Sequence, residues 1–483
     1  MNEIARLICF YLPQFHPIPE NDNWWGTGFT DWINVTKAKP VFPGHYQPHA
    51  PADLGFYDLR VPEVREAQAA LASEYGIFGF CYHHYWFAGH RLLERPFNEV
   101  LASGKPDFPF CLCWANENWT RRWDGREHEI LIQQRHSDKD DIDFIRALFP
   151  AFRDKRYIRV NGKPVLIVYQ TELLPDPART SMIWREETSK AGFEGLYLCR
   201  AETFTSYGND TDPGTIGFDA AIEFPPHAIW SASLRPTVVK GNSDFDGEVL
   251  DYEQVVYGSL MRPKPSYKLF RGVMPSWDNI PRKPRNGLVF VNSSPELYQQ
   301  WLADCIRWTR RHYQGDERLV FINAWNEWAE GCHLEPDLKY GHRYLQATRD
   351  ALRTEDNLLE ILKSKPFISD EHLNPEIIAE AFSGYASELL RTNMILKFKL
   401  SERGVGFPSL AGISQEISGL HTGEVTLSYF LSRYLRSNRV KFRRTRRLMY
   451  YVLRNLWRAG RTIKDKVDSL ELFKGKRATT KHS

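Results

Sequence analysis

Short runs of apolar, β-branched and aromatic residues recur along the chain and alternate with segments of helical periodicity. The runs cover residues 6–12, 76–86, 108–115, 163–170, 195–201, 218–224, 270–277 and 318–325. Amphipathic helical patterns lie between them, at residues 62–76, 138–154, 180–192 and 294–313. Pro62 and the Ser294-Pro295 pair are typical helix starts, and Gly76 is a typical end. Eight strands with intervening helices predict a (β/α)8 TIM barrel rather than a doubly wound sheet.

The pattern changes at about residue 356, where helical and increasingly basic segments replace the strand signals. We therefore divide the chain into a barrel over residues 1–355 and a helical basic extension over residues 356–483. Residues 431–483 hold 17 Lys+Arg against 3 Asp+Glu, so a net charge of +3 for the chain leaves the first 430 residues at −11.

The apolar and basic mixture at residues 433–466 fits a helical bundle packed on the barrel, or a peripheral membrane helix attracted to anionic lipid. Nucleic-acid binding is disfavoured, because no recognised motif or stacking platform accompanies the charge.

The 483-residue chain has seven cysteines, an odd number, and most stand inside apolar runs. This placement favours buried thiols in a reducing compartment. Cys111 and Cys113 lack a second Cys/His pair at zinc spacing, so we expect no metal and no cofactor. The N-terminal apolar run is short and broken by Pro13, and no stretch reaches the ~20 apolar residues of a membrane span. We expect a cytoplasmic protein, either free or peripheral to the inner membrane.

Aromatic, amide, imidazole and carboxylate side chains follow all eight predicted strands. Any one of them is more often a core plug or an ion-pair partner, but their joint occurrence favours a site at the C-terminal face of a barrel. Sugars need aromatic faces for stacking and polar groups for their hydroxyls, whereas no phosphate-binding glycine motif is present. We expect a carbohydrate site, with these substrate-binding candidates: Tyr11, Gln14, His83, His84, Trp86, Trp114, Asn116, Glu117, Tyr169, Glu223, Trp277, Asp278, Asn326 and Trp328.

The stretch "FINAWNEWAEGCHLEPD" after the eighth strand contains the candidate catalytic pair, Glu327 and Glu330. Residues three apart on a helical turn face the same way, and glycosidic chemistry commonly uses two carboxyl groups. Trp328 beside them can raise a carboxyl pKa by desolvation. Taken alone, the two glutamates also fit the charged face of a solvated helix. We expect Glu335 and Asp337 to be structural.

Six blocks of this sequence closely resemble the WbsX-type family, the glycoside hydrolase family 99-like domain of bacterial polysaccharide and lipopolysaccharide O-antigen gene clusters. The resemblance covers roughly residues 5–352, and its blocks are "CFYLPQFHPIPENDNWWGTGFTDWINV", "GHYQPHAPADLGFYDLR", "GFCYHHYWF", "CWANENWTRRWDG", "RYIRVNGKPVLIVY" and "NAWNEWAEGCHLEPD". It implies a barrel related to the endo-α-mannosidases and endo-α-mannanases. In these enzymes one Glu deprotonates the substrate 2-hydroxyl to give a 1,2-anhydro sugar, and a second acts as acid and then base. Their Glu-x-x-Glu matches Glu327 as the base and Glu330 as the acid/base.

We therefore expect an enzyme of cell-surface polysaccharide biosynthesis that cleaves or transfers an α-linked, manno-configured glycan. Its partner would be an oligo- or polysaccharide, free or lipid-linked. Two alternatives stay open, a nucleotide-sugar glycosyltransferase and a non-catalytic glycan-binding or assembly subunit. Export signals are common among the hydrolases and none is recognised here, so the resemblance leaves hydrolysis and transfer undistinguished.

Overall fold

A computed structural model describes residues 5–364, with the exception of residues 122–125, 204–211, 228–238, 240–243 and 263. The extension predicted for residues 356–483, including the segment 433–466, lies outside the described residues apart from the end of one helix, and its role stays a prediction. No helix among the residues described is long and apolar enough to cross a bilayer.

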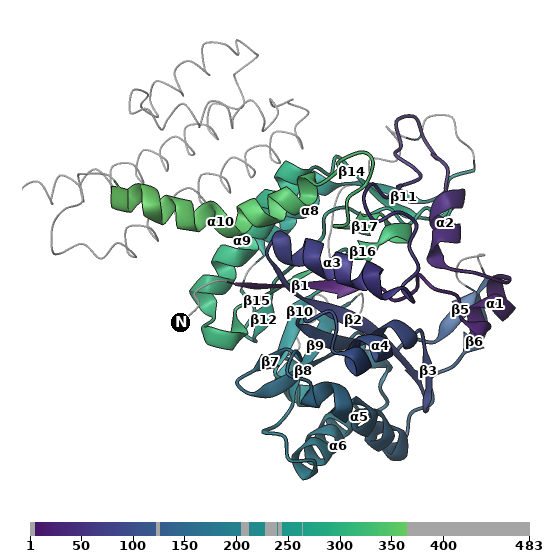
Figure 1. The fold of residues 1–483 in the computed structure, drawn as a ribbon, viewed down its shortest axis with the longest axis vertical. Helices are drawn as coiled ribbons and strands as arrows, with labels where there is room; N and C mark the ends of the chain where they lie inside the picture. Colours follow the sequence, from purple (N-terminus) through teal and green to yellow (C-terminus); the bar gives the residue numbers. More distant parts are fainter. Residues whose placement is uncertain are drawn as a thin grey trace, which may run out of the picture. The chain divides into compact units, whose positions relative to one another are not determined.

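The central element is a barrel of parallel strands, as the hydrophobic runs predict (Figure 1). In sheet order, β10 lies next to β9, then come β8, β4, β2, β1 and β15, and both ends meet the short strands β12 and β13. Only Arg271 separates β12 from β13; β12 pairs with β10, and β13 pairs with β15. The two short strands therefore act as one interrupted eighth strand that closes the barrel. The bounds are β1 (Arg6–Tyr11), β2 (Ile77–Phe87), β4 (Phe110–Trp114), β8 (Lys163–Val168), β9 (Tyr197–Glu202), β10 (Ala220–Glu223), β12 (Leu269–Phe270), β13 (Gly272–Val273) and β15 (Leu319–Ile322).

Helices follow the strands and cover the outside of the barrel. All four predicted helices are confirmed, as α3 (Pro62–Glu74), α5 (Asp138–Arg153), α6 (Pro177–Lys190) and α9 (Pro295–His312), and α4 (Arg95–Ser103), α8 (Tyr252–Met261) and α10 (Arg343–Ser364) are added. Ser137 and Ser294 cap α5 and α9 by accepting a backbone N–H in the first turn. Figure 1 shows α5 beside α6 on one flank and α9 beside α10 on another.

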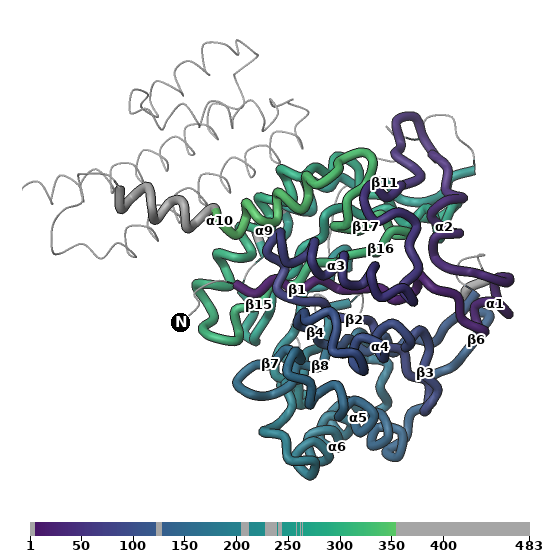
Figure 2. Tube along the Cα trace, viewed as in Figure 1, coloured from purple at the N-terminus to yellow at the C-terminus, as the bar shows by residue number. Residues whose placement is uncertain are grey.

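The long segment between β1 and β2 carries two short helices, α1 (Pro19–Trp25) and α2 (Asp31–Lys37). It packs against the segment that follows β15: the Ala52 N–H donates to the Pro336 carbonyl, and Pro51 forms a bridge with Asp337. In Figure 2 the purple tube of α2 lies near the green tube of the turn after β15. The predicted functional loop thus lies at the mouth of the barrel, where the last strand ends.

Smaller elements complete the fold. The described strands outside the barrel are β3 (His90–Leu92), β5 (Trp119–Arg121), β6 (Arg126–Ile132), β7 (Arg159–Val160), β11 (Glu248–Asp251), β14 (Leu288–Val291), β16 (Asn326–Glu327) and β17 (Cys332–His333). The 3-10 turns are η2 (Thr171–Leu173), η3 (Pro213–Ile216), η4 (Gly315–Glu317) and η5 (Trp328–Glu330). All seven cysteines are buried free thiols, as expected from their apolar neighbours.

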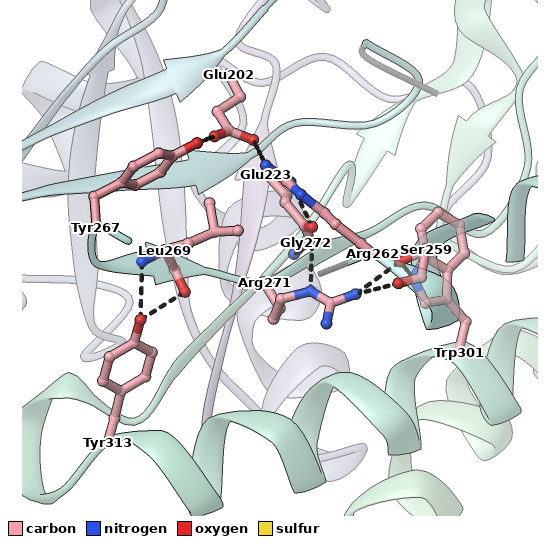
Figure 3. A network of polar contacts seen from close by, with 10 residues as sticks. All are labelled: Glu202, Glu223, Ser259, Arg262, Tyr267, Leu269, Arg271, Gly272, Trp301 and Tyr313. Carbon is pink, nitrogen blue, oxygen red and sulfur yellow. Dashed lines mark hydrogen bonds and ion pairs between the residues drawn. The ribbon is translucent and has the colours of Figure 1, made fainter. Parts of the chain in front are cut away.

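A buried network of ion pairs closes the barrel at the interrupted strand (Figure 3). The Arg271 Nε donates to Glu223 at 2.8 Å, and Arg262 donates to both Glu223 at 2.7 Å and Glu202 at 2.6 Å. A Cβ at Gly272 would meet the Glu223 carbonyl at 2.1 Å, so the close approach of these strands requires glycine. We call Glu202, Glu223, Arg262 and Arg271 the closure network.

Candidate active site

A cavity of about 450 Å3 opens at the carboxyl ends of the strands, where barrel enzymes place their active sites. Residues near or after the carboxyl ends of seven of the eight strands line it, together with loop residues. Seven predicted site residues are among them: Gln14, His83, Glu117, Tyr169, Trp277, Glu327 and Glu330.

The other nine predicted residues lie outside this cavity, and strand alternation accounts for four of them. On β2, His83 and Tyr85 face the barrel interior, whereas His84 and Trp86 face the helices, where both rings contact Phe144 of α5. The indole of Trp86 also donates to the Asp140 carboxylate at 2.8 Å. Polar and aromatic side chains at a strand end therefore serve two opposite faces.

The same alternation places Tyr11 and Trp114 outside the lumen. The Tyr11 hydroxyl donates to Gln68 of α3 at 2.7 Å, and the Trp114 ring packs on Phe144 and Trp184. Glu223 belongs to the closure network instead of the cavity. Trp328 belongs to the turn η5 and Asp278 lies beside it, as described below. The role of these residues in substrate binding stays a prediction.

Asn116 and Asn326 hold the glutamates that follow them in sequence. The Asn116 amide exchanges two hydrogen bonds with the Gln170 backbone, at 2.7 and 2.9 Å. The Asn326 amide does the same with the Leu12 backbone, at 3.0 and 2.8 Å. Each asparagine thereby joins the end of its own strand to that of a neighbouring strand, and the next residue, Glu117 or Glu327, lines the cavity. The Asn-Glu pairs are positioning units in which only the glutamate faces the cavity.

Glu327 and Glu330 are joined by one guanidinium. The Arg282 Nη2 lies 3.0 Å from the Glu327 carboxylate and 2.6 Å from Asp31 of α2, and its Nη1 lies 2.7 Å from Glu330. The Glu327 side chain is 8% exposed and that of Glu330 is 23% exposed. Three carboxylates thus share one cation, and Glu330 is the one more open to the cavity. We call these four residues the cavity cluster.

Burial raises the pKa of Glu327 to about 8. Arg282 opposes this rise, whereas the negative charges of Glu330 and Asp31 add to it. The predicted influence of Trp328 is less direct: its indole lies against His333, with ring centroids 3.7 Å apart. A carboxyl group that holds its proton near neutral pH is a strong general base once that proton is lost.

Glu335 holds the turn η5 in place through hydrogen bonds. The Glu335 carboxylate accepts from the Trp328 indole at 2.6 Å, the Tyr57 hydroxyl at 2.8 Å and the Gln68 amide at 2.7 Å. Gly331 ends the turn at φ +57°, where a Cβ would meet Asp278 at 2.9 Å. The Asp278 N–H also donates to the Glu330 carbonyl at 2.6 Å. These contacts fix the backbone that carries both catalytic candidates and support a structural role for Glu335.

Several functional candidates were absent from the predicted set. Tyr85, Trp119 and Trp25 add aromatic walls to the cavity, and their place beside predicted strand ends and in the long first loop was an available signal. Arg282 and Asp31 lie 251 residues apart, Asp31 at the start of the short helix α2, and no strand or spacing pattern marks either of them.

A second cavity of about 270 Å3 adjoins the first, and Trp277 lines both. Asp278 lies here, where its carboxylate accepts from His45 and Gln47, each at 2.6 Å. This cavity is also lined by His49, His333 and Asp337.

Comparison with known proteins identifies relatives over most of the chain. Residues 7–348 match the family described as Glycosyltransferase WbsX. The protein WxcX of Xanthomonas campestris pv. campestris, in two strains, is 48% identical over 358 residues, which cover 74% of this chain and 51% of WxcX. The chain therefore spans about half the length of these relatives.

Solved structures with low sequence identity align with a similar share of the chain. A glycoside hydrolase-like protein is 17% identical with a TM-score of 0.47, and the match covers 73% of this chain and 94% of that one. A GH99 endo-alpha-mannosidase from Bacteroides thetaiotaomicron is 14% identical with a TM-score of 0.46, and the match covers 73% of this chain and 98% of that one.

Proposed function

The chain belongs to the WbsX glycosyltransferase family, and on this premise we propose that it is a carbohydrate-active enzyme of bacterial cell-surface polysaccharide biosynthesis. It cleaves or transfers an α-linked, manno-configured glycan in lipopolysaccharide O-antigen or capsule assembly. The observation that carries this proposal is the cavity cluster, in which Arg282 joins Glu327 and Glu330 at the wall of the larger cavity.

Glu327 is the base in the proposed reaction. Its ionised carboxylate takes the proton of the substrate 2-hydroxyl, and the resulting oxygen attacks the anomeric carbon to form a 1,2-anhydro sugar. The glycosidic bond breaks as Glu330 gives its proton to the leaving oxygen. With its pKa raised to about 8, Glu327 is mostly protonated at pH 7, and its ionised form is a stronger base than an ordinary carboxylate.

The second step restores both carboxyl groups. Glu330 takes a proton from water or from an acceptor hydroxyl, whose oxygen attacks the anomeric carbon and opens the three-membered ring. Glu327 returns its proton to the sugar 2-oxygen. The greater exposure of Glu330 fits a group that exchanges protons with both leaving and entering molecules. The nature of the entering hydroxyl decides between hydrolysis and transfer.

The cavity wall suits a sugar. Tyr85 and Trp119 pack edge to face with ring centroids 5.1 Å apart, so part of the wall is a rigid aromatic surface. Glu117 accepts from Gln170 at 2.8 Å, and the Tyr169 hydroxyl lies 2.7 Å from His227. These oriented polar groups match the alternating donors and acceptors of sugar hydroxyls.

Mass spectrometry of surface polysaccharide tests the catalytic role. Cells that express the wild type are compared with cells that express Glu330→Gln at the same protein level, and the exposed Glu296→Gln serves as the matched control. We expect the variant Glu330→Gln to give the glycan of cells without the protein, and Glu296→Gln to give the wild-type glycan. Identical glycans from the wild type and Glu330→Gln would contradict the proposal and favour the binding-subunit alternative.

A titration of the purified protein tests the other alternative. Saturable binding of a nucleotide-sugar would favour conventional sugar-nucleotide transfer. In the cavity cluster three carboxylates already surround the guanidinium of Arg282, which disfavours a diphosphate at that position. We expect no saturable binding.

The proposed location is the cytoplasm or the cytoplasmic face of the inner membrane, with a free or lipid-linked glycan as substrate. The basic character of residues 433–466 supports membrane contact. Sedimentation with vesicles of anionic lipid, compared with neutral vesicles, tests this contact. Equal partition into both would contradict it.

A further inference from the structure

Three buried side chains that can ligate a metal line the second cavity, outside the cavity cluster. His49, His333 and Asp337 each offer one ligand atom, and these atoms all lie within 4.8 Å of one another. The His49 Nδ1 is 2.9 Å from the His333 Nε2. The three come from the loop before α3, from β17 and from the segment after it, so the fold brings them together from positions up to 288 residues apart. We call them the histidine–aspartate cluster.

The lone pair of His333 is already directed into the cluster. Its Nδ1 lies 2.9 Å from the Glu335 carbonyl, which can only accept, so Nδ1 carries the ring proton. In the neutral ring Nε2 is then an acceptor that faces His49. A histidine that donates its other ring N–H to a backbone carbonyl is the usual arrangement around a protein-bound metal. The Asp337 carboxylate is also oriented by the backbone, since it accepts from the Tyr340 N–H at 2.6 Å.

We propose that the histidine–aspartate cluster binds a divalent transition-metal ion, with Zn2+ as the representative. Metal–nitrogen bonds of about 2.0–2.1 Å place two ligand nitrogens about 2.9 Å apart at a right angle and about 3.3 Å apart in a tetrahedron. The observed distance of 2.9 Å between the His49 and His333 nitrogens fits the right angle. For a tetrahedral site the two nitrogens would have to move apart by a few tenths of an ångström. His49 supplies Nδ1, with its ring proton on Nε2, His333 supplies Nε2, and Asp337 supplies a carboxylate oxygen.

The second cavity gives the ion an entry path and room for water to complete its coordination, because all three ligands line it. Two neutral imidazoles and one carboxylate suit a borderline ion such as Zn2+ better than the hard ions Mg2+ or Ca2+. The assignment rests on this geometry alone and is independent of the proposed function.

Such an ion acts on the candidate active site indirectly, through the turn η5. It joins the loop before α3 to β17, and the His333 ring stacks on Trp328 at an interplanar angle of 15°. Trp328 follows Glu327 directly and belongs to η5 with Glu330. The bound ion therefore restrains the turn that carries the catalytic candidates without touching the larger cavity.

Calorimetric titration of the full chain tests the assignment, after treatment with EDTA and dialysis. We expect one Zn2+ per chain to bind saturably, and a melting temperature that rises by about 4 °C once Zn2+ exceeds its Kd 100-fold. His49→Gln and Asp337→Asn each weaken binding at least ~100-fold. X-ray absorption of the zinc-loaded wild type shows two imidazole ligands and a shell of oxygens, which checks the ligands without any variant.

His45→Gln is the matched control, because His45 lines the same cavity and faces Asp278 at 2.6 Å but lies outside the cluster. It keeps the wild-type affinity. Two results overturn the proposal: no saturable Zn2+ binding by the folded wild type, or binding that survives Asp337→Asn and is lost in His45→Gln. In either case the 2.9 Å contact is a hydrogen bond between two imidazoles and nothing more.

Discussion

The cavity cluster and the closure network both place carboxylates around arginine, yet they shift the pKa of a glutamate in opposite directions. In the closure network two arginines face two glutamates, and Arg271 and Arg262 outweigh the effect of burial, so the pKa of Glu223 falls below its ordinary value. Among the described contacts of the cavity cluster one arginine faces three carboxylates, and burial with the neighbouring charges raises the pKa of Glu327 to about 8. The ratio of cations to carboxylates distinguishes a pair that stabilises the barrel from a pair suited to proton transfer.

The largest expected effect is on catalysis. Glu327→Gln removes the proposed base, and we expect kcat/KM on the glycan substrate to fall by about 10²–10⁴. Glu202→Gln, in the closure network, leaves kcat/KM of the folded protein within a few-fold of the wild type. Steady-state kinetics of both purified variants measure the difference. Equal losses would show that the two groups of charges do not differ in function.

The next effect concerns stability, and here we expect the larger loss from a change in the closure network. Arg271→Met leaves the buried Glu223 with one partner fewer, and we expect the free energy of unfolding to fall by about 3–5 kcal/mol. Glu327→Gln changes it little near neutral pH, because the native carboxyl is then mostly protonated. Urea denaturation measures both. A large loss in Glu327→Gln together with none in Arg271→Met would reverse the comparison.

The two groups of charges contribute to stability with opposite dependence on pH. The folded pKa of Glu327 is raised, so its contribution to stability is present at acid pH and lost as the pH rises toward about 8. The folded pKa of Glu223 is lowered, so its contribution is present at neutral pH and lost as the pH falls through the acid range.

For the reaction, kcat/KM rises with pH through about 8 as Glu327 ionises. Asp31→Asn removes a neighbouring negative charge and moves this rise to lower pH. A pH–rate profile of the wild type and of Asp31→Asn measures the shift, and an unchanged profile argues against Glu327 as the titrating group.

The smallest expected effect concerns the aromatic wall. Trp119→Ala removes a stacking surface, and a loss of about 0.5–1.5 kcal/mol raises KM by about 2–10-fold with little change in kcat. Trp119→Phe keeps most of the surface and serves as the control. If both variants lower kcat and leave KM unchanged, Trp119 acts on the catalytic groups and not on sugar binding.

The fold could be predicted because barrel strands are buried on both faces and therefore form continuous apolar runs. All eight runs are strands of the barrel, although the last one before β15 is interrupted at Arg271. The split could not be seen, because the residues at the split, Arg271 and Gly272, contact Glu223, which is remote in sequence and leaves no mark in the apolar pattern.

The candidate site was predictable in part for the same reason. Burial on both faces means that an aromatic or polar residue at a strand end packs equally well against the lumen or against a helix, as His83 and His84 show. Composition alone does not separate the two faces, whereas alternation within each strand does. Arg282 and Asp31 could not be found, because only the folded chain brings them together across 251 residues, with Asp31 on the short helix α2.

The alternation along β2 also has a consequence for laboratory evolution. A library that randomises His83 and Tyr85 changes the wall of the larger cavity, and one that randomises His84 and Trp86 changes the contact between the barrel and α5. In a deep mutational scan, tolerance measured by abundance and tolerance measured by activity should therefore oscillate out of phase along this strand, with a period of two residues.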